Sequence, residues 1–214
     1  MLGGILLDMF ENENTNQATQ KKEHKLTKAQ SFFKDARDVF YILAIFMLVY
    51  VLCFRSVVVV GSSMFDTLVD GDRLLLVNNL FYRQAEQGDI IVASKDSFRN
   101  GECIIKRVIA TEGQVVDIDF SNGTVFVDGI AIDEAYLYSG TYNPEGMKFP
   151  LTVDKGCIFV MGDNRLDSKD SRSPEIGLID EREVLGKAFF LLWPGTGTRE
   201  YPKEFDFFRI GVVN

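Results

Sequence analysis

An apolar run over residues 39–54 (VFYILAIFMLVYVLCF) has no charge, glycine or proline and constrains this chain most strongly. As a helix it would be about 24 Å long, at about 1.5 Å per residue, whereas a bilayer core needs about 30 Å. A buried core helix is therefore one interpretation. However, the run is apolar on every face, whereas a surface helix carries a polar stripe, and the valines of residues 57–60 could lengthen it. The sequence predicts a transmembrane anchor over residues 39–60.

The two sides of this run differ in charge. Residues 1–38 are polar, and residues 11–20 (ENENTNQATQ) have the composition of a disordered segment. Basic residues gather before the run, whereas Arg55 is the only one soon after it. Because cytoplasmic flanks carry the excess of Lys and Arg, we expect a single-pass protein of the cell membrane with residues 1–38 in the cytoplasm and residues 61–214 outside. A cleaved signal peptide is disfavoured, since the preceding segment is far longer than a charged n-region.

Residues 61–214 alternate short apolar runs with turn signals. The dipeptides Asn122-Gly123 and Asp128-Gly129 are typical of tight hairpin turns. No run is followed by a long amphipathic helix, so a parallel α/β sheet is disfavoured. We predict a mainly β protein, a single all-β domain with one N-terminal transmembrane helix. The expected strands are residues 74–77, 89–92, 103–109, 114–118, 124–127, 157–161 and 184–193.

Charge and cysteine usage exclude several functions. The net charge of −8 argues against a surface that neutralises nucleic-acid phosphates, and there is no glycine-rich phosphate loop. Cys53, Cys103 and Cys157 form no C-x-x-C pair, and the single histidine, His24, lies far from all three. We therefore expect no metal site and no cofactor. The sequence leaves open whether Cys103 and Cys157 form a disulfide or remain thiols.

A hydrolase built on this chain would have to work without histidine in its outer part. His24 is predicted on the other side of the membrane, so a Ser-His-Asp triad is excluded. A serine can instead be activated by a neutral lysine. Lowering a lysine pKa from about 10.4 to near 7 corresponds to roughly 4–5 kcal/mol, which burial can supply. Lys106 lies in the apolar run IIKRVIA. Because neighbours in a strand face opposite sides, we expect only one of Lys106 and Arg107 to point inward.

Taken singly, these features have ordinary structural explanations. Ser63 follows the anchor in a turn, where serines are common. Lys106 and Arg107 could be two exposed cations on a strand. The polar segment of residues 162–172 could be a surface turn held by its own side chains. Only their combination favours a catalytic site.

Together and in this order, the segments resemble those of bacterial type I signal peptidases, the Ser/Lys-dyad leader peptidases. That family carries an anchor, a G-x-S-M-x-P-T-L box, a GD pair, an apolar-K-R-V box and a GDNR-x-x-S-x-D-S-R box. Here residues 61–68 are GSSMFDTL and residues 71–72 are GD. Residues 104–110 are IIKRVIA and residues 162–172 are GDNRLDSKDSR. The resemblance extends over essentially all the chain from residue 39.

The resemblance implies that Ser63, rather than Ser62, is the nucleophile and that Lys106 is the general base. Two positions depart from the family pattern. Asp66 replaces a proline that would fix φ, and its negative charge would favour the ammonium form of a nearby lysine. Gly61 stands where some members carry an oxyanion-stabilising serine, which leaves the N–H of Ser63 as the donor we can name.

The last box supplies the supporting residues that the resemblance implies. Ser168 corresponds to the residue whose hydroxyl helps to orient the lysine amine. Asp170 and Arg172 correspond to a supporting ion pair with a structural role. Gly162 would let the backbone pass close to the site, as only a residue without Cβ can.

The resemblance also implies a function and its partners. The expected protein is a membrane-bound serine endopeptidase that removes signal peptides from exported preproteins through an acyl-enzyme. Its partners would be preproteins with small residues at the first and third positions before the cut, together with membrane lipid; nucleic acid and metal are not expected. The substrate would lie extended between residues 57–61 and 103–105. The residues expected to bind it are Val59, Val60, Gly61, Met64, Ile104 and Ile105.

Two other functions deserve comparison with this one. Asp66 motivates a catalytically weakened relative that binds or assists assembly of exported, pilin-like proteins, although intact Ser63 and Lys106 argue against it. A self-cleaving repressor protease uses a similar Ser/Lys pair, but it would need a DNA-binding domain in place of the anchor and the acidic charge.

Overall fold

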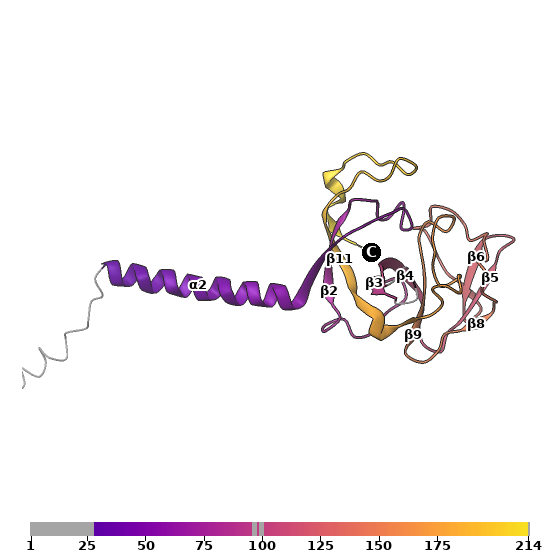
Figure 1. The fold of residues 1–214 in the computed structure, drawn as a ribbon, viewed down its shortest axis with the longest axis horizontal. Helices are drawn as coiled ribbons and strands as arrows, with labels where there is room; N and C mark the ends of the chain where they lie inside the picture. The colour runs from indigo at the N-terminus through magenta and orange to yellow at the C-terminus, as the bar shows by residue number, and fades with distance from the viewer. Residues whose placement is uncertain (1–27, 96–97, 99–100, 214) are drawn as a thin grey trace, which may run out of the picture. The chain divides into compact units, whose positions relative to one another are not determined.

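The computed structural model describes residues 28–95, 98 and 101–213. The structure divides into two units between Val49 and Tyr50. Within the described residues the protein is mainly β with one N-terminal apolar helix, as predicted (Figure 1).

Helix α2 runs over Lys28–Cys53. Its part Ser31–Cys53 is 23 residues long and is a candidate membrane span by length and composition. At about 1.5 Å per residue this part measures roughly 34 Å, longer than a bilayer core of about 30 Å, with Lys34, Asp35, Arg37 and Asp38 near its N-terminal end. The helix gains this length at its N-terminal end and includes residues 28–38, which were predicted to belong to the polar N-terminal segment. Residues 1–27 lie outside the described residues.

The predicted anchor of residues 39–60 is too long at its C-terminal end. Residues Phe54–Val58 form strand β1, which pairs antiparallel with β2 from Phe54↔Val77 to Val58↔Arg73. Valine is β-branched and favours extended backbone, and the ladder to β2 supplies partners that a continued helix would not. The valines of residues 57–60 therefore belong to the β-rich unit.

The larger sheet contains eight antiparallel strands in the order β1-β2-β11-β3-β4-β9-β10, with β12 paired to β11. A second sheet has the order β7-β6-β5-β8, and Figure 1 shows β5, β6 and β8 grouped together. The remaining strands of the first sheet are β2 (Arg73–Asn78), β3 (Ile90–Ser94), β4 (Cys103–Ala110), β9 (Cys157–Met161), β10 (Ile179–Asp180), β11 (Val184–Trp193) and β12 (Gly211–Val212). The second sheet comprises β5 (Val115–Asp119), β6 (Thr124–Val127), β7 (Ile130–Ala131) and β8 (Leu151–Thr152).

All seven predicted strands are confirmed, at β2, β3, β4, β5, β6, β9 and β11. Besides β1, the strands that the sequence did not predict are two residues long (β7, β8, β10 and β12) and carry no periodicity to recognise. Two short 3₁₀ helices, η1 (Glu181–Glu183) and η2 (Phe207–Arg209), complete the described elements.

The centre of the larger sheet is covered on both faces. On β3, Ile90 and Val92 pack in one buried cluster, whereas Ile91 and Ala93 pack in another. Such a strand is a continuous apolar run rather than an alternating one. Strand β4 lies beside β3, so its side chains also meet covered surface on both sides.

Cys103 and Cys157 are free thiols, so the disulfide that the sequence left open is absent. Strand β9 pairs with β4 antiparallel, from Arg107↔Met161 to Ala110↔Phe159. This register places Cys157 beyond the C-terminal end of β4, whereas Cys103 begins the same strand. A disulfide needs Cα atoms within about 7 Å, which this register does not allow.

Candidate active site

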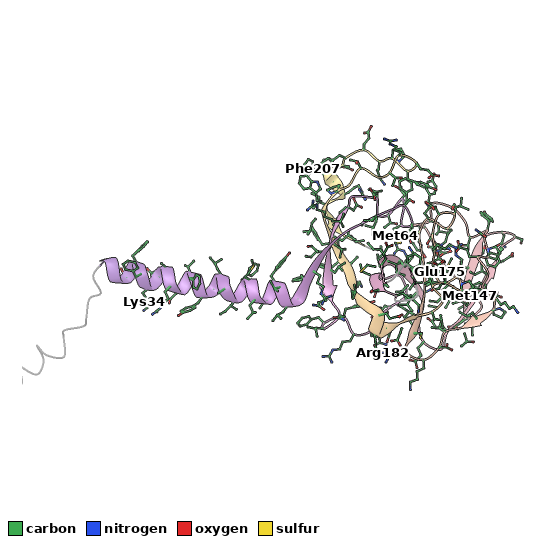
Figure 2. The ribbon with its side chains drawn as sticks, in the orientation of Figure 1. Lys34, Met64, Met147, Glu175, Arg182 and Phe207 are labelled. Carbon is green, nitrogen blue, oxygen red and sulfur yellow. The ribbon has the colours of Figure 1, made fainter. Side chains whose placement is uncertain are left out.

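Ser63 lies in the turn that follows β1. Gly61 opens this turn with a φ of +90°, a conformation that glycine adopts without strain, and its N–H donates to Asp70 Oδ1 at 2.8 Å. Met64 (labelled in Figure 2) and Leu68 are each 1% exposed and pack into the buried cluster beneath the turn. These two anchors fix the turn, while Ser63 itself stays partly exposed.

Lys106 reaches Ser63 from strand β4. Ile104, Lys106 and Val108 share one face of this strand because alternate residues point to the same side. Ile104 and Val108 belong to a buried cluster, and Lys106 is 4% exposed. Its Nζ lies 2.7 Å from Ser63 Oγ and 3.1 Å from the carbonyl oxygen of Ile105. The fold thus brings the predicted nucleophile and base into hydrogen-bond contact.

Burial lowers the pKa of the Lys106 ammonium from 10.5 to about 8, with desolvation as the largest cause. The negative charges of Asp170, Asp163 and Asp167 oppose this effect, and the positive charge of Arg172 adds to it. At pH 7 an amine of pKa about 8 is neutral roughly one time in ten, compared with about one in three thousand at a pKa of 10.5. The amine can therefore accept a proton near neutral pH.

Arg107 is buried as well, at 3% exposure, so the prediction that only one of the two cations would point inward is wrong. Alternation does direct the two side chains to opposite sides of β4, but both sides are covered. Arg107 donates to Asp163 from Nε at 2.9 Å and from Nη2 at 2.8 Å. Thr67 Oγ1 donates to the same carboxylate at 2.6 Å. Asp163 therefore ties the turn of Ser63 to the strand of Lys106.

The loop after β9 passes against the backbone of Ser63. A Cβ on Gly162 would lie 2.4 Å from the carbonyl oxygen of Ser63 and 2.2 Å from Ser168 Oγ, so only glycine fits there. The N–H of Asn164 donates to the Ser63 carbonyl at 3.0 Å. Asn164 Nδ2 donates to the carbonyl of Ser62 at 3.2 Å. The loop thus holds the two consecutive carbonyls of Ser62 and Ser63.

A buried carboxylate organises the rest of this loop. Asp170 is fully buried and accepts from Arg172 Nε and Nη2, both at 2.8 Å. It also accepts from the N–H of Gly162 at 3.1 Å and from the hydroxyl of Ser168 at 2.8 Å. Ser168 therefore uses its hydroxyl on Asp170, and its expected part in orienting Lys106 stays a prediction. The pKa of Asp170 lies below its ordinary value: burial, the largest influence, raises it, but the bonds and charge of Arg172 outweigh burial.

A groove with a volume of about 520 Å³ opens beside Ser63 and Lys106. Most of its lining residues come from the end of β1, the turn after it and the first half of β4, and Asp167 and Lys169 of the loop after β9 also line it. The six residues expected to bind substrate all line it: Val59, Val60, Gly61, Met64, Ile104 and Ile105.

One wall of this groove is an open strand edge. Strand β3 pairs with β4 over Cys103–Arg107, whereas β9 pairs with it only from Arg107 to Ala110. Within the described part of the chain, no strand pairs with the second edge of residues 103–106. An extended peptide in the groove could add to this edge through main-chain hydrogen bonds.

Asp66 is paired with a cation from the C-terminal part of the chain. Its carboxylate pairs with the ammonium of Lys203, which also donates to the Asp66 carbonyl at 3.2 Å. The acidic groups that raise the pKa of Lys106 are Asp170, Asp163 and Asp167. The expected influence of the Asp66 charge on the lysine is therefore reduced by a paired cation.

This geometry is suited to nucleophilic acyl transfer without histidine. A serine hydroxyl touches a desolvated lysine amine beside a groove that can hold an extended chain. Among the described residues, no group of three or more His, Cys, Asp or Glu is placed to hold a metal ion. The site is that of a serine hydrolase in which lysine can serve as the base.

Comparison with known proteins agrees with this class. Residues 32–193 match the family model described as signal peptidase, peptidase S26. Signal peptidase I of Bacillus amyloliquefaciens is 34% identical over 175 residues, which cover 78% of this chain and 88% of that protein. Signal peptidase I T of Bacillus subtilis is 31% identical over 200 residues, covering 90% and 99%. A solved signal peptidase I from Enterococcus faecalis is 29% identical over 49% of this chain and 97% of that chain, with a TM-score of 0.40.

The chain therefore belongs to the peptidase S26 family of signal peptidases, as the sequence boxes indicated. Sequence reasoning did not assign roles to Asp163, Asn164 or Thr67. Each lies inside a box that the resemblance matched, so its position was a usable signal. The contact of Lys203 with Asp66 could not be predicted, because Lys203 lies outside the matched boxes and no sequence pattern links the two residues.

Proposed function

We propose that this protein is a membrane-bound serine endopeptidase that removes signal peptides from exported preproteins. The contact between Ser63 Oγ and Lys106 Nζ, at 2.7 Å and with the lysine buried, carries this proposal. Family membership supports the substrate class, since the two similar Bacillus proteins are named signal peptidase I and signal peptidase I T.

The mechanism follows from which group holds the proton. Neutral Lys106 accepts the hydroxyl proton of Ser63 as Oγ attacks the scissile carbonyl carbon. The resulting ammonium donates that proton to the leaving nitrogen as the C–N bond breaks, which leaves an acyl-enzyme on Ser63 Oγ. Water then loses a proton to Lys106 and attacks the ester, and Lys106 returns a proton to Ser63 as the second product leaves.

The supporting residues act through position. Asp163 joins the Ser63 turn to Arg107 on the base strand, and Asn164 fixes the carbonyl of Ser63. Within the described residues, the N–H of Ser63 donates to no main-chain carbonyl. It is therefore available to stabilise the oxyanion of the tetrahedral intermediate. These contacts hold the reacting groups in place before substrate arrives.

The substrate lies extended in the groove. Residues before the cut pair with the open edge of β4 near Ile104 and Ile105, and their small side chains fit the part of the groove lined by Val59 and Met64. Alanine at the first and third positions before the cut suits this part of the groove. The pairing of Asp66 with Lys203 weakens the motivation for the alternative, a weakened relative that binds pilin-like proteins, because the Asp66 charge has a paired cation.

Cleavage of a fluorogenic signal-site peptide by the full chain in detergent tests the proposal. We expect turnover by the wild type and loss of at least about 10³-fold in Ser63→Ala and Lys106→Ala, as for a nucleophile and its base, with thermal unfolding showing intact domains. A wild type that cleaves neither such peptides nor a labelled preprotein, up to alkaline pH, contradicts the proposal.

Membrane orientation is part of the same proposal. Lys34 and Arg37 stand at the N-terminal end of the candidate span, and Arg55 follows it. Because cytoplasmic flanks carry the excess of Lys and Arg, we propose that the β-rich unit lies outside the cytoplasm. Cys103 is exposed and can report this. With Cys53 and Cys157 changed to Ala, we expect a membrane-impermeant maleimide to label Cys103 in intact cells. Labelling only after permeabilisation would reverse the orientation.

A further inference from the structure

The segment that follows β11 lies beyond the residues matched by the family model, which end at residue 193. Residues 194–209, drawn in yellow in Figure 1, form a loop closed by an isolated bridge between Gly197 and Pro202. The N–H of Lys203 also donates to Thr196 O at 2.9 Å. The segment ends in η2, where Phe207 is labelled in Figure 2. We call residues 194–209 the C-terminal strap.

The strap first touches the end of the nucleophile turn. The N–H of Gly195 donates to Asp72 Oδ1 at 2.6 Å. A Cβ on Gly195 would lie 2.2 Å from Asp70 O, so the two backbones are in direct contact. The N–H of Gly197 donates to the same Asp70 carbonyl at 3.1 Å. Asp70 in turn accepts from Gly61, so the strap supports both ends of the turn that carries Ser63.

A buried ion pair makes the second contact. Arg209 donates to Asp72 from Nη1 at 3.0 Å and from Nη2 at 2.7 Å, and Asp72 is fully buried. Nη2 also lies 3.4 Å from the carbonyl of Thr67. Asp72 accepts from Val69 N–H at 2.9 Å. One carboxylate thus collects donors from the turn and from the strap.

The third contact lies three residues from Ser63. Lys203 bonds both the carboxylate and the carbonyl of Asp66. Beside it, the rings of Tyr201 and Phe65 have centroids 5.3 Å apart. Asp66 stands where the sequence box that this chain resembles has proline. Proline would fix φ through its ring, whereas Asp66 has no ring and is contacted by Lys203 at both its side chain and its carbonyl.

We propose that the C-terminal strap is a positioning element for Ser63, in which Lys203 on Asp66 takes the place of a proline in the turn and Arg209 on Asp72 secures its far end. The proposal deepens the proposed function and rests on it for its kinetic test. Lys203 and Arg209 touch the turn, and they act on the reaction only through the place of Ser63 Oγ relative to Lys106 Nζ.

The Lys203 contact separates positioning from stability. The side chains of Lys203 and Asp66 are 30% and 57% exposed, and exposed pairs add little to stability. We therefore expect Lys203→Met to leave the thermal unfolding temperature unchanged within error. Because small displacements of a reacting atom slow chemistry strongly, we expect kcat to fall roughly three- to tenfold, with KM within about twofold. Lys155→Met, at an exposed lysine outside the strap, is the matched control and is expected to behave as the wild type.

Rescue tests the assignment of Lys203 to the missing proline. Asp66→Pro should make the ion pair dispensable, so we expect Asp66→Pro/Lys203→Met to recover kcat to within about twofold of Asp66→Pro alone. The charge-reversed pair Asp66→Lys/Lys203→Asp should recover more activity than either single reversal. A Lys203→Met enzyme with wild-type kcat, or a loss that neither combination restores, overturns the proposal.

Hydrogen exchange keeps the test independent of the proposed function. We expect amide exchange over residues 61–70 of the full chain in detergent to be faster in Lys203→Met than in Lys155→Met, whether or not the wild type cleaves peptide. Arg209→Met should accelerate exchange further, although it leaves the buried Asp72 without its cation and lowers the unfolding temperature. If amide exchange in Lys203→Met is unchanged, the positioning role of the strap is overturned. If exchange is accelerated but the wild type cleaves no peptide, only the proposed function is overturned.

Discussion

Nζ of Lys106 lies 2.7 Å from Oγ of Ser63, although 43 residues separate them in the chain. Ser63 arrives from the turn after β1, and Lys106 arrives from β4, which is separated from β1 by β2, β11 and β3 in the order of the sheet. The contact therefore depends on the whole sheet and on the loops that tie its ends together.

The first prediction concerns pH. Activity needs the neutral amine of Lys106, whose pKa is lowered to about 8 by burial. The neutral fraction grows as pH rises through the pKa, so kcat/KM should rise with pH, with a midpoint near 8, and then level off. The pH profile of peptide cleavage by the full chain measures this. A profile that is flat between pH 6 and 9 would contradict a lysine base.

The second prediction concerns the stability cost of the buried base. The folded pKa of Lys106 lies below its ordinary value, so the unfolded chain binds the proton more tightly and burial destabilises the fold below about pH 8. The shift corresponds to about 3 kcal/mol. Lys106→Met should therefore be inactive yet up to about 3 kcal/mol more stable at pH 7. Its advantage should shrink as pH rises from about 8 towards 10.5, which unfolding at several pH values can show.

The third prediction concerns Asp167, which lines the groove and bonds the hydroxyl of Ser62. Its negative charge raises the pKa of Lys106. Asp167→Asn should therefore move the midpoint of the kcat/KM profile to lower pH. The kcat/KM at pH 6.5, divided by that at pH 9, should increase. Asp154→Asn, an exposed position away from the groove, should leave the midpoint where it is. An upward shift in Asp167→Asn would exclude this electrostatic role.

The fourth prediction concerns close approach at Gly162. A Cβ there would meet the Ser63 carbonyl oxygen at 2.4 Å, so Gly162→Ala must displace the loop or the nucleophile. We expect turnover to fall by at least about 100-fold, as for a misplaced reacting group. Gly211→Ala is the stability control, because its Cβ would meet nothing within 4 Å. Near-normal cleavage by Gly162→Ala would mean that the loop yields easily.

The fifth prediction separates a buried ion pair from an exposed one. Arg107 and Asp163 are 3% and 0% exposed, and removing one partner of such a pair costs about 3–5 kcal/mol. Arg107→Met should lower the unfolding temperature markedly. In the ion pair of Arg182 with Asp180, the side chains are 90% and 30% exposed. Arg182→Met should therefore leave the unfolding temperature unchanged. Equal effects of the two variants would refute the difference that burial predicts.

The sequence boxes were sufficient to indicate the family, the nucleophile turn and the base strand. They worked because turns, apolar runs and special glycines are local requirements. The prediction that only one of Lys106 and Arg107 points inward was wrong. Alternation along a strand predicts that the two side chains face opposite sides of the sheet, but it does not predict whether both sides are buried.

The sequence by itself determined that this chain has an apolar helix, a β-rich unit and the chemical groups of a Ser/Lys site, since periodicity, turn dipeptides and residue types are all local. Only the tertiary structure decided that Phe54–Val58 leaves the helix for the sheet and that Lys106 is desolvated enough to lower its pKa. The pairing of Asp66 with Lys203, 137 residues away, was decided in the same way. These outcomes depend on which distant segments come into contact, and desolvation and ion pairing arise only from such contacts.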